Sequence, residues 1–329
     1  MNKTIKNFSI TLLFFILTIL LLTFPKESLS FSFTGLQLWF NRMLPTLLPF
    51  MILSAVMIKL NLTENFVCLL NPILNPFLSI SPDGIYAVII GFLCGFPMGA
   101  KITADLYTEH KLSRNEASFL LCFCNNIGPV YFLSFVLPTL GLSKKLPYLF
   151  GMYGLPLLYG IFLRHTLYKN KIPKKSPFHP ICPTSISLAD ALDESIMSSL
   201  LSIAKLGGYM ILFNLLNLFP AALTKLLSFP TLFHLSITFC GINGLTPDML
   251  LNCLLEITSG ISRMGNLFPL PVLLLLPFGG FSCLAQTCSM LKGTDLSIKN
   301  YVFHKMILTI ITIIYYGLWL LFSPSSFLL

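Results

Sequence analysis

Long apolar stretches without a formal charge alternate with short polar segments along most of the chain. Each stretch reaches the roughly 18 to 20 residues that a membrane-spanning helix requires. The pattern therefore predicts an α-helical protein that crosses a membrane several times. The uncharged stretches are Asn7–Pro25, Ala117–Ser143, Leu146–Leu163, Leu206–Thr224, Leu226–Pro247, Met264–Leu291 and Met306–Leu329.

Two further apolar segments, residues 84–107 and 248–267, are interrupted by glycine, proline or small polar residues. The first contains Gly95-Phe96-Pro97 and the second contains Thr258-Ser259-Gly260. We predict that each segment is a re-entrant hairpin that turns at these residues. Corresponding broken segments in two halves of a chain are typical of the binding site of a secondary transporter.

The basic residues orient the predicted helices. Cytoplasmic loops are enriched in Lys and Arg, and the densest basic cluster, Arg164–Lys175, contains no acidic residue. With a cytoplasmic N-terminus, this cluster also lies in the cytoplasm only if residues 84–107 enter and leave the membrane on one side. The predicted transmembrane helices then cover approximately residues 8–24, 43–60, 117–140, 146–163, 196–219, 271–291 and 301–322.

The predicted fold is an all-α polytopic membrane protein with about seven transmembrane helices and two re-entrant hairpins in an inverted-topology repeat. Local matches such as Met51-Ile52-Leu53 with Met210-Ile211-Leu212 support the repeat. The predicted parts are an N-terminal anchor helix with an external amphipathic segment (1–42), a first repeat (43–168), a basic cytoplasmic linker (169–195) and a second repeat (196–329).

Composition agrees with a membrane protein. Hydrophobic residues make up 55% of the 329 positions and charged residues 10%, with a mean hydropathy of +0.82. Soluble domains carry about a quarter charged residues. The net charge of +9 is spread over short loops, so we expect no nucleic-acid partner.

The chain shows no motif for enzymatic chemistry. The nine cysteines and five histidines have no zinc-site spacing. No His-Glu-x-x-His or Gly-x-Ser-x-Gly motif occurs. We therefore expect no enzyme, no catalytic residue, no metal site and no cofactor.

Ionisable side chains beside the two breaks are candidates for the chemistry of a binding site. Lys101 follows the first break, and Asp105 lies four residues further on the same helical face. Lys101 either pairs with Asp105 or contacts an anionic substrate group that Asp105 orients. Glu256 has no basic residue within four positions. It is either a proton or sodium coupling group or a structural hydrogen-bond partner of the facing hairpin.

Polar residues in the helices after each hairpin complete the predicted site, although such residues also join membrane helices structurally. Asn125 and Asn126 precede Gly128-Pro129, and Ser282 and Gln286 are i,i+4 neighbours. Glu256 is the predicted ion-coupling residue. The predicted substrate-binding residues are Gly95, Phe96, Pro97, Gly99, Lys101, Asn125, Asn126, Thr258, Ser259, Gly260, Ser282 and Gln286.

Several of these motifs resemble those of the YlbJ family of sporulation integral membrane proteins. That family belongs to the Gate or nucleoside recognition domain group, which includes concentrative nucleoside transporters and the ferrous-iron transporter FeoB. The resemblance implies a role in spore formation and two re-entrant hairpins around a central site. The first tip, Phe96-Pro97-Met98, lacks a carboxylate or amide, so a nucleoside substrate is not implied. The resembling stretches are Met43–Phe50, Gly95–Lys101, Leu112–Ala117, Leu255–Gly260 and Phe278–Ser282.

These observations leave two functional hypotheses. The first is a secondary transporter or channel-like protein of the cell membrane that binds a small polar or anionic solute between the hairpin tips. The alternative is a membrane factor for spore formation that does not transport and instead binds partners or assists assembly. The expected partners are membrane lipid, an unidentified small molecule or ion, and either further copies of the chain or sporulation membrane proteins.

Overall fold

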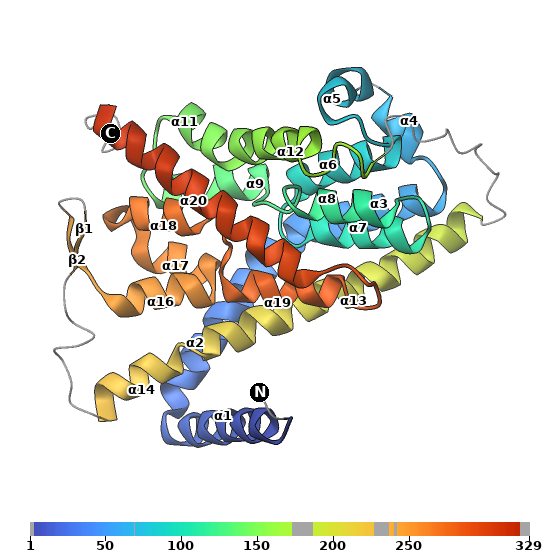
Figure 1. Ribbon diagram of the computed structural model, residues 1–329. Coiled ribbons are helices and arrows are strands. Elements are labelled where there is room, and N and C mark those ends of the chain that lie inside the picture. The colour runs from blue at the N-terminus through green and yellow to red at the C-terminus, as the bar shows by residue number, and fades with distance from the viewer. Residues whose placement is uncertain (1–2, 69, 173–186, 227–236, 240–241, 323–329) are drawn as a thin grey trace.

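The computed structural model describes residues 3–68, 70–172, 187–226, 237–239 and 242–322, and this part is almost entirely helical (Figure 1). The centre of the predicted basic linker, residues 173–186 with Lys174 and Lys175, lies outside the described residues. The first-half helices are α1 (Lys3–Thr23), α2 (Pro25–Leu38), η1 (Trp39–Met43), α3 (Leu44–Lys59), α4 (Thr63–Val67), α5 (Asn71–Leu78), α6 (Pro82–Cys94), α7 (Met98–Thr108), α8 (Arg114–Leu121), α9 (Pro129–Tyr131), η2 (Phe132–Val136), α10 (Leu137–Thr139), α11 (Lys145–Leu149), η3 (Phe150–Gly154) and α12 (Leu155–His165).

The second half begins with a long helix that crosses the molecule (Figure 1). This helix, α13, packs against α2, α3 and α19. The second-half elements are α13 (Leu188–Leu215), α14 (Leu218–Leu226), β1 (Ile237–Phe239), β2 (Ile242–Leu245), α16 (Pro247–Leu255), α17 (Ile257–Met264), η4 (Gly265–Leu267), α18 (Pro269–Leu275), α19 (Gly280–Met290) and α20 (Ile298–Phe322).

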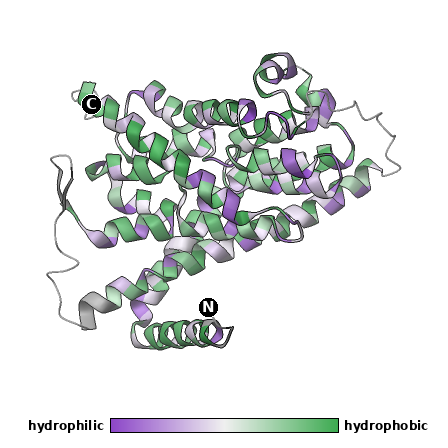
Figure 2. Cartoon of the chain, viewed as in Figure 1, coloured by the Kyte–Doolittle hydropathy of each residue, from purple (hydrophilic) through white to green (hydrophobic). Residues whose placement is uncertain are grey.

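The helices are long and apolar enough to cross a membrane five times, or six if the bent pair α5–α6 is one span. α1 and the region from α9 to α10 contribute only shorter apolar helices. Large hydrophobic side chains face outward, including Phe15 on α1 and Ile314 on α20, and Figure 2 shows how apolar residues dominate these helices. Outward-facing apolar surface of this extent suits lipid rather than water. The chain is a multi-pass membrane protein.

The segment after α1 differs from the prediction. Residues 25–41 were expected to form an external amphipathic stretch, but α2, η1 and α3 form one helical span from Pro25 to Lys59. Pro25 occupies the start of α2, where a missing backbone N–H leaves no hydrogen bond unmade. The only interruption is at Phe24, whose backbone is non-helical (φ −122°, ψ 63°).

Three π-helical turns, η1, η2 and η3, each end two residues before a proline. The prolines are Pro45, Pro138 and Pro156. A proline ring collides with the carbonyl four residues earlier in a regular helix, and a locally widened turn relieves this collision. The turns η1 and η2 also touch, because the Arg42 guanidinium lies 5.1 Å from the centre of the Phe135 ring.

The first predicted hairpin is present, and its turn lies at the predicted residues. α6 starts at a Ser81 N-cap that accepts from the Gly84 N–H and ends at Cys94, and α7 begins at Met98. The arms pack closely, since a Cβ added to Gly91 would lie 3.1 Å from the Cα of Gly99. The Phe96–Pro97 peptide bond is cis.

The second hairpin turns three residues earlier than predicted. α16 ends at Leu255, Glu256 is extended (φ −143°, ψ 106°), and α17 begins at Ile257. Thr258-Ser259-Gly260 therefore form the first turn of α17 and not the reversal. A Cβ on Gly260 would lie 2.6 Å from the Cα of Cys253, so these two arms also approach closely.

A break follows each hairpin in the helical segment next along the chain. Between α8 and α9 the backbone is unwound over residues 122–128, and between α18 and α19 it is unwound over residues 276–279. The predicted span 117–140, which follows the first hairpin, is thus two half-helices. The sequence predicted one transmembrane helix over these residues.

The prediction of an all-helical chain missed a short sheet. β1 and β2 pair antiparallel, with Ile237 opposite Leu245 and Phe239 opposite Ile242. These residues belong to the uncharged stretch Leu226–Pro247, which lies between a predicted helix and the second hairpin, and β-branched residues such as Ile237 and Ile242 favour strands.

Gly207 provides a test of the packing between α13 and the N-terminal span. A Cβ at Gly207 would lie 2.7 Å from the Trp39 ring, whose Nε1 donates to the Ile203 carbonyl at 2.9 Å. We expect Gly207→Leu to destabilise the fold by about 1–3 kcal/mol through overpacking. The neighbouring Gly208 meets no atom within 4 Å. Thermal melting in detergent should thus show a lowered Tm for Gly207→Leu and little change for Gly208→Leu; equal losses would contradict this packing.

Candidate functional site

A cavity of about 60 Å³ lies where the two hairpin tips meet. It is lined by both tips, by both breaks and by parts of the N-terminal span and α13. The lining residues are Met43, Thr46, Leu47, Phe50, Leu93, Cys94, Phe96, Ile127, Gly128, Val130, Tyr131, Leu206, Met210, Glu256, Ile257, Thr258, Leu276, Cys283 and Gln286. Residues from both halves of the chain therefore converge on one space.

The first tip packs against both breaks. A Cβ on Gly95 would lie 2.2 Å from the Gly128 nitrogen, so the first tip touches the first break backbone to backbone. On the other side, a Cβ on Gly279 would lie 3.2 Å from the Phe96 ring. Phe96 therefore closes the space between the first tip and the second break.

Glu256 supplies the only acidic or basic side chain among the described residues that line the cavity. Its carboxylate caps α17, accepting the Ser259 N–H at 2.7 Å, and only 1% of the residue is exposed. The Ser259 hydroxyl donates to the Asn252 Oδ1 at 3.3 Å and to the Glu256 carbonyl at 3.1 Å. The second tip is thus a small polar cluster with a carboxylate at its centre.

A lysine from α20 holds the first break. The Lys305 ammonium donates to the Asn125 carbonyl and, at 3.1 Å, to the Asn126 Oδ1. The Asn125 side-chain amide donates to Thr287 at 3.1 Å and to Tyr301 at 3.0 Å. These contacts replace the helical hydrogen bonds that the unwound backbone lacks.

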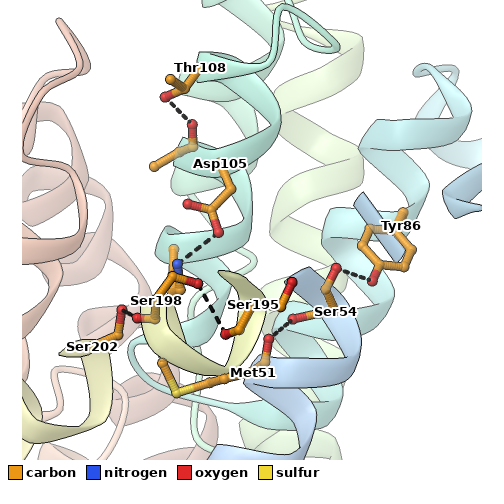
Figure 3. Close-up of polar contacts among 10 residues, drawn as sticks. Met51, Ser54, Tyr86, Asp105, Thr108, Ser195, Ser198 and Ser202 are labelled. Atoms are coloured by element: carbon orange, nitrogen blue, oxygen red, sulfur yellow. Dashed lines mark hydrogen bonds and ion pairs between the residues drawn. The ribbon is translucent and has the colours of Figure 1, made fainter. Parts of the chain in front are cut away.

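Lys101 lies away from the cavity in a second polar region. Its ammonium pairs with Asp105 at 2.9 Å, and Lys101 is 9% exposed. Figure 3 shows Asp105 on α7 together with Ser54 on α3 and with Ser195 and Ser198 on α13. The structure therefore shows the intrahelical ion pair, one of the two alternatives for Lys101.

The residues proposed from sequence fall into three groups. Phe96, Glu256, Thr258 and Gln286 line the cavity. Behind it, Ser282 accepts from Gln286 at 2.9 Å, and Ser259 lies in the polar cluster beside Glu256. The remaining residues are packed around the breaks and hairpin arms without lining the cavity: Gly95, Pro97, Gly99, Lys101, Asn125, Asn126 and Gly260.

Sequence reasoning missed Lys305, Asn252, Thr287 and Tyr301. Lys305 carried a usable signal, because it is an ionisable residue within a predicted membrane helix. Thr287 and Tyr301 are ordinary residues of apolar helices, and only the tertiary packing brings them to Asn125.

Comparisons with known proteins give one informative relationship. The chain is 28% identical over 319 residues to the sporulation integral membrane protein YlbJ of Bacillus subtilis (strain 168), covering 89% of this chain and 78% of that protein. No protein-family model matches the chain, and no solved structure matches it significantly. The aligned region includes both hairpins and both breaks. The resemblance noted from the motifs is therefore confirmed: the chain is a homologue of the sporulation integral membrane protein YlbJ.

Proposed function

We propose that this protein is a secondary transporter or channel-like protein that serves spore formation, and that it binds a small polar or anionic solute between the two hairpin tips. The proposal rests on one observation: both hairpin tips and both breaks line the same cavity, and Glu256 is among the lining residues. Broken helices around a site shared by two halves are typical of secondary transporters. The name of the Bacillus subtilis relative supports the sporulation role.

In this proposal the structure represents the closed conformation of the transporter. A volume of about 60 Å³ holds an ion or a few water molecules, whereas ligand pockets usually measure about 300–1,000 Å³. A solute would therefore enter only when the tips separate. The Phe96 ring against Gly279 is the contact that must open.

Glu256 is the proposed coupling group. A carboxylate in a membrane interior is unfavourable unless it is protonated or paired, and the ion pairs found among the described residues do not include it. In this proposal Glu256 exchanges a proton or a sodium ion as the tips open. Lys101, which pairs with Asp105 away from the cavity, has no part in this coupling.

Transport by vesicles that contain the purified protein tests this proposal. Small-metabolite uptake or efflux would be screened first, and Glu256→Gln would then be measured. We expect it to reduce coupled transport at least about tenfold, since the amide keeps the shape but cannot exchange a cation. Asp248→Asn is the matched control, because Asp248 lies on the same hairpin but pairs with Arg263 outside the cavity. Equal transport by wild type and Glu256→Gln would refute the coupling role.

The non-transporting alternative is favoured by two observations, the small volume of the cavity and the pairing of Lys101 with Asp105. A protein of that kind would tolerate changes at the hairpin tips. Complementation of a sporulation defect distinguishes the two hypotheses: a transporter loses function with Glu256→Gln, whereas an assembly factor retains it.

A further inference from the structure

The ammonium of Lys305 occupies a position with the features of a cation site. The residue is 0% exposed and lies in the third turn of α20. Two of its hydrogen bonds go to oxygen atoms of the first break, the Asn125 carbonyl and the Asn126 Oδ1. Both oxygens belong to neutral groups, so no carboxylate among these contacts balances the charge.

Aromatic rings cover the rest of the ammonium. The centre of the Phe96 ring lies 4.7 Å from the Lys305 nitrogen, and that of Tyr301 lies 5.9 Å away. A ring face attracts a cation within about 6 Å. Phe96 also lines the cavity, so the ammonium contacts the first hairpin tip and the first break together.

Carbonyl oxygens of an unwound membrane helix are the groups that bind Na⁺ or H⁺ in many transporters. In this protein the Lys305 ammonium donates to a backbone carbonyl and a side-chain oxygen of the first break. We propose that Lys305 is a tethered cation that takes the place of a free inorganic cation at the first break and fixes the Phe96 tip against it.

This assignment goes beyond the proposed function, because it concerns what occupies the first break and holds whether or not the protein transports. With Lys305 in this role, the two halves of the chain differ in the charge they place near the cavity. The first break carries a built-in positive charge, whereas the second tip carries the Glu256 carboxylate.

Melting of the purified full-length protein in different salts of equal ionic strength tests the proposal. The Tm of each variant is compared with that of wild type in choline, sodium, potassium and methylammonium chloride, so that an effect of sodium at Glu256, which all these proteins share, cancels. Lys305→Ala removes the charge and leaves space, and in choline chloride it should lower the Tm by about 5 °C or more. At least half of that loss should return in one of the salts with a small cation.

Two further variants separate charge from packing. Lys305→Met removes the charge but fills most of the space, so it should show no recovery with any cation. Lys299→Ala removes an exposed lysine from the same helix, and its Tm should equal that of wild type in every salt.

Three outcomes would overturn the proposal. One is a Lys305→Ala protein that melts at the same temperature in choline as with the small cations. Another is a wild-type protein whose Tm rises as much from choline to the small cations as the Tm of Lys305→Ala does. The third is a Lys305→Ala protein that cannot be recovered folded in any of these salts, because a free cation would then be unable to replace the ammonium.

Discussion

Replacing Gly95 with alanine is expected to prevent the first hairpin from closing. The backbone at Gly95 has φ +90° and ψ −169°, a conformation that side chains other than glycine's rarely adopt. A Cβ there would also lie 2.2 Å from the Gly128 nitrogen. Neither backbone can move without separating the tip from the first break. We expect a loss of about 4 kcal/mol or more, which is at the high end for single substitutions.

Thermal melting in detergent and the yield of monodisperse protein measure this loss. Gly317→Ala is the control, because a Cβ at Gly317 on α20 meets nothing within 4 Å. Alanine in a helical position with open space around its Cβ is neutral or slightly stabilising. If Gly95→Ala melted within a degree or two of Gly317→Ala, the tip could not be packed as described.

The second large effect is expected at Arg164, near the end of α12. Its guanidinium donates to the carbonyl of Ser79 at 2.9 Å, of Tyr168 at 3.0 Å and of Ile172 at 3.1 Å, and a longer bond reaches Lys169. It joins the end of α5 to the turn that follows α12. Arg164→Ala would leave these carbonyls without their donor, and each buried unsatisfied group costs about 1–3 kcal/mol. We expect a total loss of about 3 kcal/mol or more.

Arg114→Ala is the matched comparison. The Arg114 side chain is 66% exposed and pairs with Asp295 at 2.8 Å. Surface pairs of this kind contribute about 0–1 kcal/mol. Melting curves should therefore rank wild type and Arg114→Ala close together and Arg164→Ala well below both. If Arg114→Ala lowered the Tm as much as Arg164→Ala does, the hydrogen bonds of Arg164 would not be what holds this loop.

Arg164 also shows what the sequence can and cannot reveal. The positive-inside pattern predicted that it belongs to a basic cytoplasmic loop, because loop charge is a property of composition. Its role in binding backbone carbonyls depends on where α5 ends, and that is set by tertiary packing. Of the neighbouring cluster, Lys174 and Lys175 lie outside the described residues.

The hairpins were predictable to different degrees. Gly95-Phe96-Pro97 gave the first turn correctly, because glycine and proline act directly on the backbone. The second turn was placed at Thr258-Ser259-Gly260, yet it occurs at Glu256, whose carboxylate caps the following helix. N-caps are usually Ser, Thr, Asp or Asn, so a glutamate in this role gave no local signal.

The N-terminal prediction failed for a related reason. Residues 25–41 were predicted to form an external amphipathic segment, but Pro25 starts a helical span that continues to Lys59, and Pro45 follows a widened turn within it. Proline marks a change in backbone hydrogen bonding, and the tertiary structure decides whether that change is an end, a kink or a π turn. A site between the hairpin tips was predicted, but the wall that the N-terminal span contributes was not. Met43 lies more than 200 residues from Glu256 in the sequence, and only tertiary packing brings both to one cavity.

The widened turns η1 and η2 bear on how the closed space could open. A π turn interrupts the regular helical hydrogen-bond ladder, and such turns are frequent at functional sites. Met43 at the end of η1 borders the cavity, and Arg42 connects η1 to Phe135 in η2. The Arg42–Phe135 contact therefore joins the N-terminal span to the half-helix behind the first break, so two widened turns lie together at one wall of the cavity.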